Sequence, residues 1–191
     1  MKRAALIVTS VKHCVSAHDT LRVQDTVAAL RRAGWSVDVL TPSRNQILSA
    51  TLDADVRVFT VPRLPFKGTM MFLRGMALVA RRDYAVLHGF DEGAGIVRAV
   101  DRLIRKRFAY VAEIHHPQLV GKQTVARASA VIVPDAETLA GFEEPPPKAR
   151  VSILPDPHAE LADNALTAAE FGAAIEAIYT YVLRKRPEES K

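Results

Sequence analysis

The amino-acid sequence predicts an α/β protein built on a doubly wound parallel sheet, Rossmann-like, with helices on both faces. Short apolar runs without period-2 alternation, such as residues 4–9, are typical of strands that are buried on both faces. Amphipathic stretches separate these runs at the spacing of βαβ units. The chain has 191 residues, 49% hydrophobic and 25% charged, which is a globular composition and favours a single domain.

The first βαβ unit has the clearest boundaries. A strand over 4–9 is followed by Asp19 or Thr20, either of which is suited to cap a helix over 21–33. Gly34 stands where helices often end in a left-handed residue, and Pro42 closes the next strand. Further strands are expected over 35–40, 56–61, 84–87, 108–114, 130–133 and 151–154, and helices over 69–82, 93–107, 135–142 and 167–183, with a short helix between 116 and 127.

The helix expected over 167–183 carries the strongest local signals. Thr167 and Glu170 have the spacing of a capping box. We expect a Rossmann-like domain over 1–157, followed by a connector and a C-terminal helix over 158–191 that packs back on it. One apolar stripe runs along this helix: Phe171, Ala174, Ile175, Ile178, Tyr179 and Val182.

Composition excludes several classes of protein. A single cysteine, Cys14, excludes a disulfide framework and a cysteine-rich zinc site. A membrane span needs roughly 20 apolar residues, and charges interrupt every long apolar stretch. The basic start is followed by an apolar run too short for a signal peptide, so we expect a cytoplasmic protein. The net charge of +5 permits an anionic partner without requiring one.

Ligands of doubly wound sheets bind beyond the carboxyl ends of the strands, so the strand exits are the candidate site. The first exit has no glycine before Gly34, which argues against the NAD and ATP fingerprints, and no cofactor is predicted. Glycines between Gly89 and Gly95 follow the fourth expected strand. They indicate either close helix–sheet packing or an anion-binding helix N-terminus, and Asp91 and Glu92 weaken the second reading.

Two histidines, His115 and His116, follow the apolar strand over 110–114. Adjacent strand residues point to opposite faces, so the pair is unsuited to one metal ion, and no metal site is predicted. At a strand exit one of them projects into the cleft, and His88 ends the preceding expected strand in the same way. The alternative is a hydrogen-bonded surface histidine. Cys14 is more often an incidental thiol than a nucleophile, and no Gly-x-Ser-x-Gly motif is present.

Basic residues gather on one expected helix. Arg98, Arg102 and Arg105 share a face because they are spaced by four and three. Such a face is either simply solvated or, with the loop around 63–67, a contact for anionic lipid or a phosphate-bearing acceptor. No nucleic-acid reading module is recognisable, so no nucleic-acid partner is expected.

Taken in order, these segments resemble the N-terminal half of the GT-B retaining glycosyltransferases of family 4. Residues 19–23 and 29–42 are similar to the first βαβ unit of that family, with Trp35 where histidine is usual. Residues 83–88 resemble its Asp-x-x-x-x-His strand, and 110–115 resemble the strand that ends in a cleft histidine. Residues 129–135 and 151–155 resemble its later strands, and the similarity covers 4 to 157.

The resemblance implies the acceptor-binding half of a sugar-transfer system in glycan or glycolipid synthesis, including polysaccharide biosynthesis. The donor-binding second domain of the family has no counterpart here, and the C-terminal helix resembles its closing helix. A separate donor-domain subunit is therefore an implied partner, with a sugar or lipid-phosphate acceptor and a peripheral contact at the inner face of the membrane. Two alternatives stay open: a non-catalytic binding or scaffolding module, and an unrelated enzyme such as an epimerase or hydrolase. The implied site comprises His115 as the catalytic residue and His88, His13, Arg22 and His116 as acceptor-binding residues.

Overall fold

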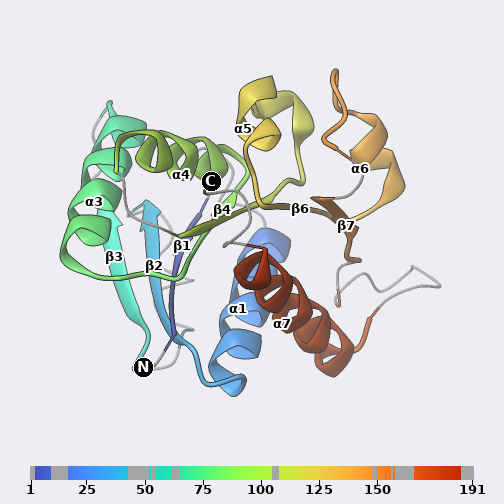
Figure 1. Cartoon of the computed structure of the whole chain (residues 1–191), viewed down its shortest axis with the longest axis horizontal. Helices are drawn as coiled ribbons and strands as arrows, with labels where there is room; N and C mark the ends of the chain where they lie inside the picture. Colours follow the sequence, from blue (N-terminus) through green and yellow to red (C-terminus); the bar gives the residue numbers. More distant parts are fainter. Residues whose placement is uncertain are drawn as a thin grey trace.

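The sheet is parallel throughout, as the sequence predicts. The computed structural model describes residues 3–9, 17–42, 52, 55–61, 65–104, 108–147, 150–155, 157 and 166–185. In these ranges seven strands pair in the order β3-β2-β1-β4-β5-β6-β7 (Figure 1). They are β1 (Ala4–Val8), β2 (Ser36–Pro42), β3 (Arg57–Val61), β4 (Val86–Phe90), β5 (Ala109–Glu113), β6 (Ala130–Val133) and β7 (Val151–Ile153).

The strand order reverses between β1 and β4. From β1 the chain builds outward through β2 to β3, then returns to place β4 on the other side of β1. Ile7 in β1 pairs with Val39 of β2 on one side and with His88 of β4 on the other. Two loops therefore leave in opposite directions at the carboxyl end of this pair, which is where open α/β sheets form their ligand crevice.

Helices cover both faces of the sheet. Helices α1 (Ala17–Arg32) and α7 (Ala168–Arg184) lie on one face (Figure 1). Helices α3 (Lys67–Arg81), α4 (Glu92–Leu103) and α5 (Lys122–Ala126) lie on the other. The 3₁₀ turn η1 (Pro117–Leu119) follows β5, and α6 (Ala136–Ala140) follows β6. No helix in the described part of the chain has the length and apolar character needed to cross a membrane.

The boundary of β4 differs from the expected one, and the difference moves a candidate residue. We expected a strand over 84–87, but β4 runs from Val86 to Phe90. His88 therefore lies inside the strand and not at its exit. Because side chains alternate between faces, His88 points to the same face as Val86 and Phe90, toward α1 and α7. The sequence suggested an early end because histidine and glycine interrupt the apolar run.

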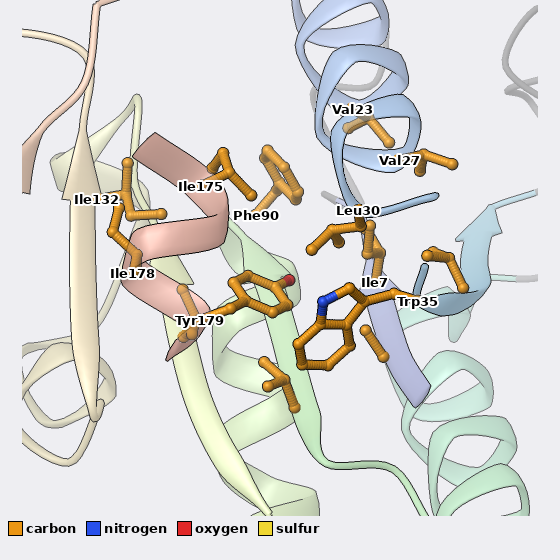
Figure 2. Close-up of a cluster of buried hydrophobic side chains, with 14 of the residues drawn as sticks. Ile7, Val23, Val27, Leu30, Trp35, Phe90, Ile132, Ile175, Ile178 and Tyr179 are labelled. Atoms are coloured by element: carbon orange, nitrogen blue, oxygen red, sulfur yellow. The ribbon is translucent and has the colours of Figure 1, made fainter. Parts of the chain in front are cut away.

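Helix α7 closes the face that α1 leaves open. Its residues Phe171, Ile175, Ile178 and Val182 enter the core formed with α1 and the sheet. Figure 2 shows Ile175, Ile178 and Tyr179 directed from α7 toward the sheet. The Tyr179 ring meets Trp35 edge to face, with centroids 5.1 Å apart. The predicted capping box is confirmed: Glu170 N–H donates to Thr167 Oγ1, and Thr167 N–H donates to Glu170 Oε2.

Three glycines stand where a side chain would be unfavourable, one at a helix end and two where α4 approaches the sheet closely. Gly34 has a φ of +82° just after α1, as predicted for a helix C-terminus. A Cβ added to Gly93 would lie 2.4 Å from the Val8 carbonyl oxygen, and one added to Gly89 would lie 2.5 Å from the Ala94 nitrogen. Helix α4 thus begins directly against the ends of β1 and β4, and close helix–sheet packing accounts for both glycines.

We predict that a chain truncated after Asn164 loses its fixed tertiary structure. The truncation removes five core side chains from α7, and its apolar ones, Phe171, Ile175, Ile178 and Val182, each contribute about 1.5–3 kcal/mol through burial. A whole domain is stable by only about 5–15 kcal/mol. Near-ultraviolet circular dichroism and dye binding should report a molten state.

The full chain carrying Ile175→Ala serves as a graded control, with an expected loss of about 2–5 kcal/mol in the free energy of unfolding. A truncated chain that stays monomeric and equally heat-stable would contradict the prediction. It would indicate that α7 serves a partner instead of this core.

Candidate functional site

A buried cluster of polar side chains lies at the carboxyl edge of the sheet, on the face that α1 and α7 cover. Two of its members, His88 of β4 and Glu113 of β5, point to this face because of strand alternation. Helix α1 supplies Arg22, α7 supplies Tyr179, and His115 follows β5. We call these five residues the carboxyl-edge cluster.

Glu113 is the centre of the cluster. It is the last residue of β5, and its side chain has no exposed surface. Arg22 Nε donates to Glu113 Oε1 over 2.6 Å, and the Arg22 side chain is also fully buried. An ionised carboxylate at such a depth is tolerated only with a charged partner and further hydrogen bonds. The pair therefore constrains where α1 sits over β5.

Arg22 also reaches the end of the sheet. Its two terminal nitrogens donate to the backbone carbonyls of Leu154 over 2.9 Å and Pro155 over 2.8 Å, just after β7. The guanidinium lies 4.2 Å from the centre of the Phe171 ring of α7. One side chain thus joins α1, β5, the end of β7 and α7. Each of the three guanidinium nitrogens donates a hydrogen bond within the chain.

His88 links Glu113 to α7. Its Nδ1 lies 3.0 Å from the Tyr179 hydroxyl oxygen, and its ring stacks on Phe90 with centroids 4.7 Å apart. Its Nε2 is 3.1 Å from Glu113 Oε2, a close electrostatic contact in which neither atom makes a hydrogen bond to a described residue. Burial first, and then Glu113, raise the pKa of Tyr179 well above its usual value, so the hydroxyl keeps its proton.

His115 is the member of the cluster that reaches the surface. Its Nε2 lies 3.3 Å from Glu113 Oε1, and its side chain is 10% exposed, whereas those of Arg22, His88 and Glu113 are fully buried. The Phe90 ring packs edge-on against it, with centroids 6.3 Å apart. His115 is therefore the member of the cluster that a ligand at the carboxyl edge of the sheet can contact.

A strained turn fixes the backbone of this histidine. Asp91 has a φ of +45°, a left-handed conformation that is unfavourable for a residue with a Cβ. Its Oδ1 accepts the backbone N–H groups of His115 over 2.8 Å and His116 over 2.9 Å. Burial raises the pKa of Asp91, and these two hydrogen bonds oppose that rise. The exit of β4 thus holds the exit of β5 in place.

The charges of the cluster reinforce one another. Burial alone would raise the pKa of Glu113, but Arg22 above all, then His115 and His88, hold it well below its usual value. Burial likewise favours neutral His115, but the Glu113 carboxylate and Asp91 raise the pKa of its imidazole. A histidine oriented by a buried carboxylate is suited to accept a proton from a hydroxyl group at the sheet edge.

The structure brings together some of the predicted site residues and separates others. His88 and His115 meet at Glu113, and the side chains of His88 and Arg22 have no exposed surface. His116 is half-buried beside His115. His13 and Arg105 lie outside the described residues, and Arg98 and Arg102 lie on α4 over the opposite face.

Sequence reasoning missed Glu113, Tyr179 and Asp91 as members of the site. Glu113 had a detectable signal, because a carboxylate inside the apolar run 110–114 requires a buried cation. Tyr179 was read only as part of an apolar stripe, and its hydroxyl gave no sign of a partner. Among the described residues, no group of three or more histidine, cysteine, aspartate or glutamate side chains is arranged to hold a metal ion.

The comparisons with known proteins bear on the fold. No family model and no curated protein matches the sequence. HepE of Anabaena, solved in complex with UDP, matches 82% of this chain and 44% of its own, with a TM-score of 0.55 and 13% identity. UGT89C1 of Arabidopsis thaliana, complexed with UDP, matches 93% of this chain and 57% of its own, with a TM-score of 0.55 and 11% identity. The chain shares their fold and spans about half their length.

We predict that Glu113→Gln destabilises the protein strongly. The substitution keeps the shape of the side chain but leaves the Arg22 guanidinium buried without its counter-charge, at a cost of about 3–5 kcal/mol. Urea unfolding measures the change. Lys122→Ala, which removes only the exposed contacts to Glu143 and Glu144, should leave the midpoint unchanged. Equal midpoints for the two variants would refute a central role for the buried pair.

We predict that His115 contributes stability that is lost toward alkaline pH. Its pKa is raised on folding, so the contribution is complete below its ordinary pKa of about 6.5 and fades as the pH rises through the folded value. The difference in unfolding midpoint between wild type and His115→Gln should therefore shrink from pH 6 to pH 9. A difference that grew with pH would have the wrong sign. NMR titration of His115 in the Glu113→Gln variant should show a lower pKa.

Proposed function

We propose that this chain is a glycosyltransferase-like protein that acts as the acceptor-binding half of a sugar-transfer system. The observation that carries the proposal is the Glu113–His115 pair, placed at the carboxyl edge beside the point where the strand order reverses. This is the position at which folds of this class bind ligands. The fold shared with two UDP-bound proteins supports the same reading.

In this proposal His115 contacts the acceptor hydroxyl. The imidazole takes the hydroxyl proton while the acceptor oxygen forms a bond to the anomeric carbon of the donor sugar, and the nucleoside diphosphate leaves. Glu113 stabilises the imidazolium that forms, and Arg22 keeps Glu113 ionised. His88, Tyr179 and Asp91 act indirectly, by fixing the orientation of Glu113 and of the His115 backbone.

The donor sugar is supplied by a second subunit in this proposal. The chain spans about half the length of the UDP-bound structures that it matches, 44% of one and 57% of the other. A separate chain carrying the nucleotide-sugar domain would pack over the carboxyl edge and complete the cleft. The acceptor is a sugar or a lipid phosphate of glycan, glycolipid or polysaccharide synthesis.

We place this system in the cytoplasm, with a peripheral contact to the inner face of the membrane. Phe66 and Leu73 on and beside α3 are 73% and 53% exposed, next to the cations Lys67 and Arg74. Exposed apolar side chains beside basic ones suit the surface of an anionic bilayer. A lipid-linked acceptor would then be presented near the protein.

A non-catalytic binding or scaffolding module remains the second candidate. The observation that favours it is that each of the three guanidinium nitrogens of the buried Arg22 donates within the chain, to Glu113, Leu154 and Pro155. A cluster that serves only to hold α1 and α7 on the sheet would look the same around this residue. The two candidates differ in what His115 does.

An add-back experiment tests the proposal. Extracts of source cells that lack this chain are supplied with labelled nucleotide sugar, and label entering the lipid and glycan fractions is measured. We expect transfer to fall without the chain, to return with wild type, and to stay at least tenfold lower with His115→Ala. That loss should exceed any loss of folded protein, which circular dichroism measures on the same samples.

Lys122→Ala is the matched control and should restore transfer fully. Full restoration by His115→Ala would support the scaffolding module instead. Unchanged transfer in extracts that lack the chain would reject the sugar-transfer proposal altogether.

A further inference from the structure

A basic pocket lies on the face of the sheet opposite the carboxyl-edge cluster. It has a volume of about 340 Å³ and is lined by Arg98 and Arg102 of α4, Gln123 and Ala126 of α5, and Arg127. Helix α4 runs back from the carboxyl edge, and Arg127 lies just before β6 begins. The pocket is thus displaced toward the amino edge, away from His115.

The walls of the pocket are held in place from beneath. The buried Tyr110 hydroxyl lies 2.9 Å from the Ala94 carbonyl of α4 and 3.1 Å from the Thr124 carbonyl of α5. Arg150 Nη1 lies 3.3 Å from the carbonyls of Ala126 and Ala128, on either side of Arg127. The spacing between the arginines of α4 and Arg127 is therefore set by the fold and does not depend on a ligand.

The pocket has more cationic side chains than acidic ones. Arg98 is oriented by a hydrogen bond from its Nη2 to Gln123 Oε1. Its Nε is buried and, within the described residues, makes no hydrogen bond. Arg102 and Arg127 are exposed at the rim, and the neighbouring acidic residue, Asp101, is a single charge against three. Guanidinium groups match the oxygens of a phosphate group in geometry and in charge.

We propose that this pocket binds a phosphate group, with Arg98, Arg102 and Arg127 as its ligands. The group belongs either to a free phosphorylated small molecule or to the headgroup of an anionic lipid, and the recognition chemistry is the same for both. This site shares no residue with the carboxyl-edge cluster, so its test does not depend on the role proposed for His115. It gives the chain a second point of attachment or regulation.

The test uses the full chain at 150 mM salt. Pyrophosphate binding is followed by calorimetry and by the thermal midpoint. Flotation is measured with vesicles of phosphatidylcholine alone and with added phosphatidic acid. We expect saturable pyrophosphate binding that weakens at least tenfold in the double variant Arg102→Glu with Arg127→Glu. Binding without flotation would assign the site to a soluble ligand, and flotation that pyrophosphate competes away would assign it to a lipid headgroup.

Arg81→Glu with Arg184→Glu, at the exposed ends of α3 and α7, makes the same change in net charge outside the pocket, and should bind pyrophosphate like the wild type. His115→Ala should also bind normally, which separates this result from the fate of the proposed function. Three results would overturn the site: no saturable binding to either probe, equal binding by the pocket variant, or equal weakening by both double variants.

Discussion

The buried contact between Arg22 and Glu113 is the interaction on which the carboxyl edge of this protein depends. Both side chains are removed from water, so each charge requires the other. Because Arg22 also donates to the carbonyls after β7 and packs on Phe171, the same charge fixes α1, the last strand and α7. Such a pair adds little net stability, but its loss leaves a buried charge without compensation.

A second buried carboxylate, Asp38, also binds arginines, but its arginines are partly exposed to water. Arg57 binds it through two hydrogen bonds of 3.0 Å, and Arg82 and Tyr84 donate to the same group. The side chains of Arg57 and Arg82 are 56% and 30% exposed, so water shares their charge. Asp38 joins β2 to Arg57 of β3 and to Arg82 and Tyr84 after α3, near the amino edge of the sheet. Glu113 instead contacts His115, which is partly exposed at the carboxyl edge.

Helix α7 connects the stability of the fold with the geometry of the candidate site. Its apolar side chains complete one core, and its Tyr179 hydroxyl contacts His88 within that core. A change that shifts α7 therefore also moves the partner of His88 and, through Glu113, the environment of His115. The basic pocket is formed by α4 and α5 on the other face of the sheet, so a shift of α7 does not act on it directly.

The sequence by itself determined the parallel α/β class, the sequence order of strands and helices, the cap of α7 and the end of α1 at Gly34, because these follow from local periodicity and backbone preference. It also located His115 at a strand exit. Only the tertiary structure decided that β4 continues through His88, and that Glu113 gathers Arg22, His88 and His115. The physical reason is that a buried polar residue is defined by its partners. His115 is close in sequence to Glu113, but Arg22 lies 91 residues away in α1 and His88 lies in the neighbouring strand, where no local pattern records them.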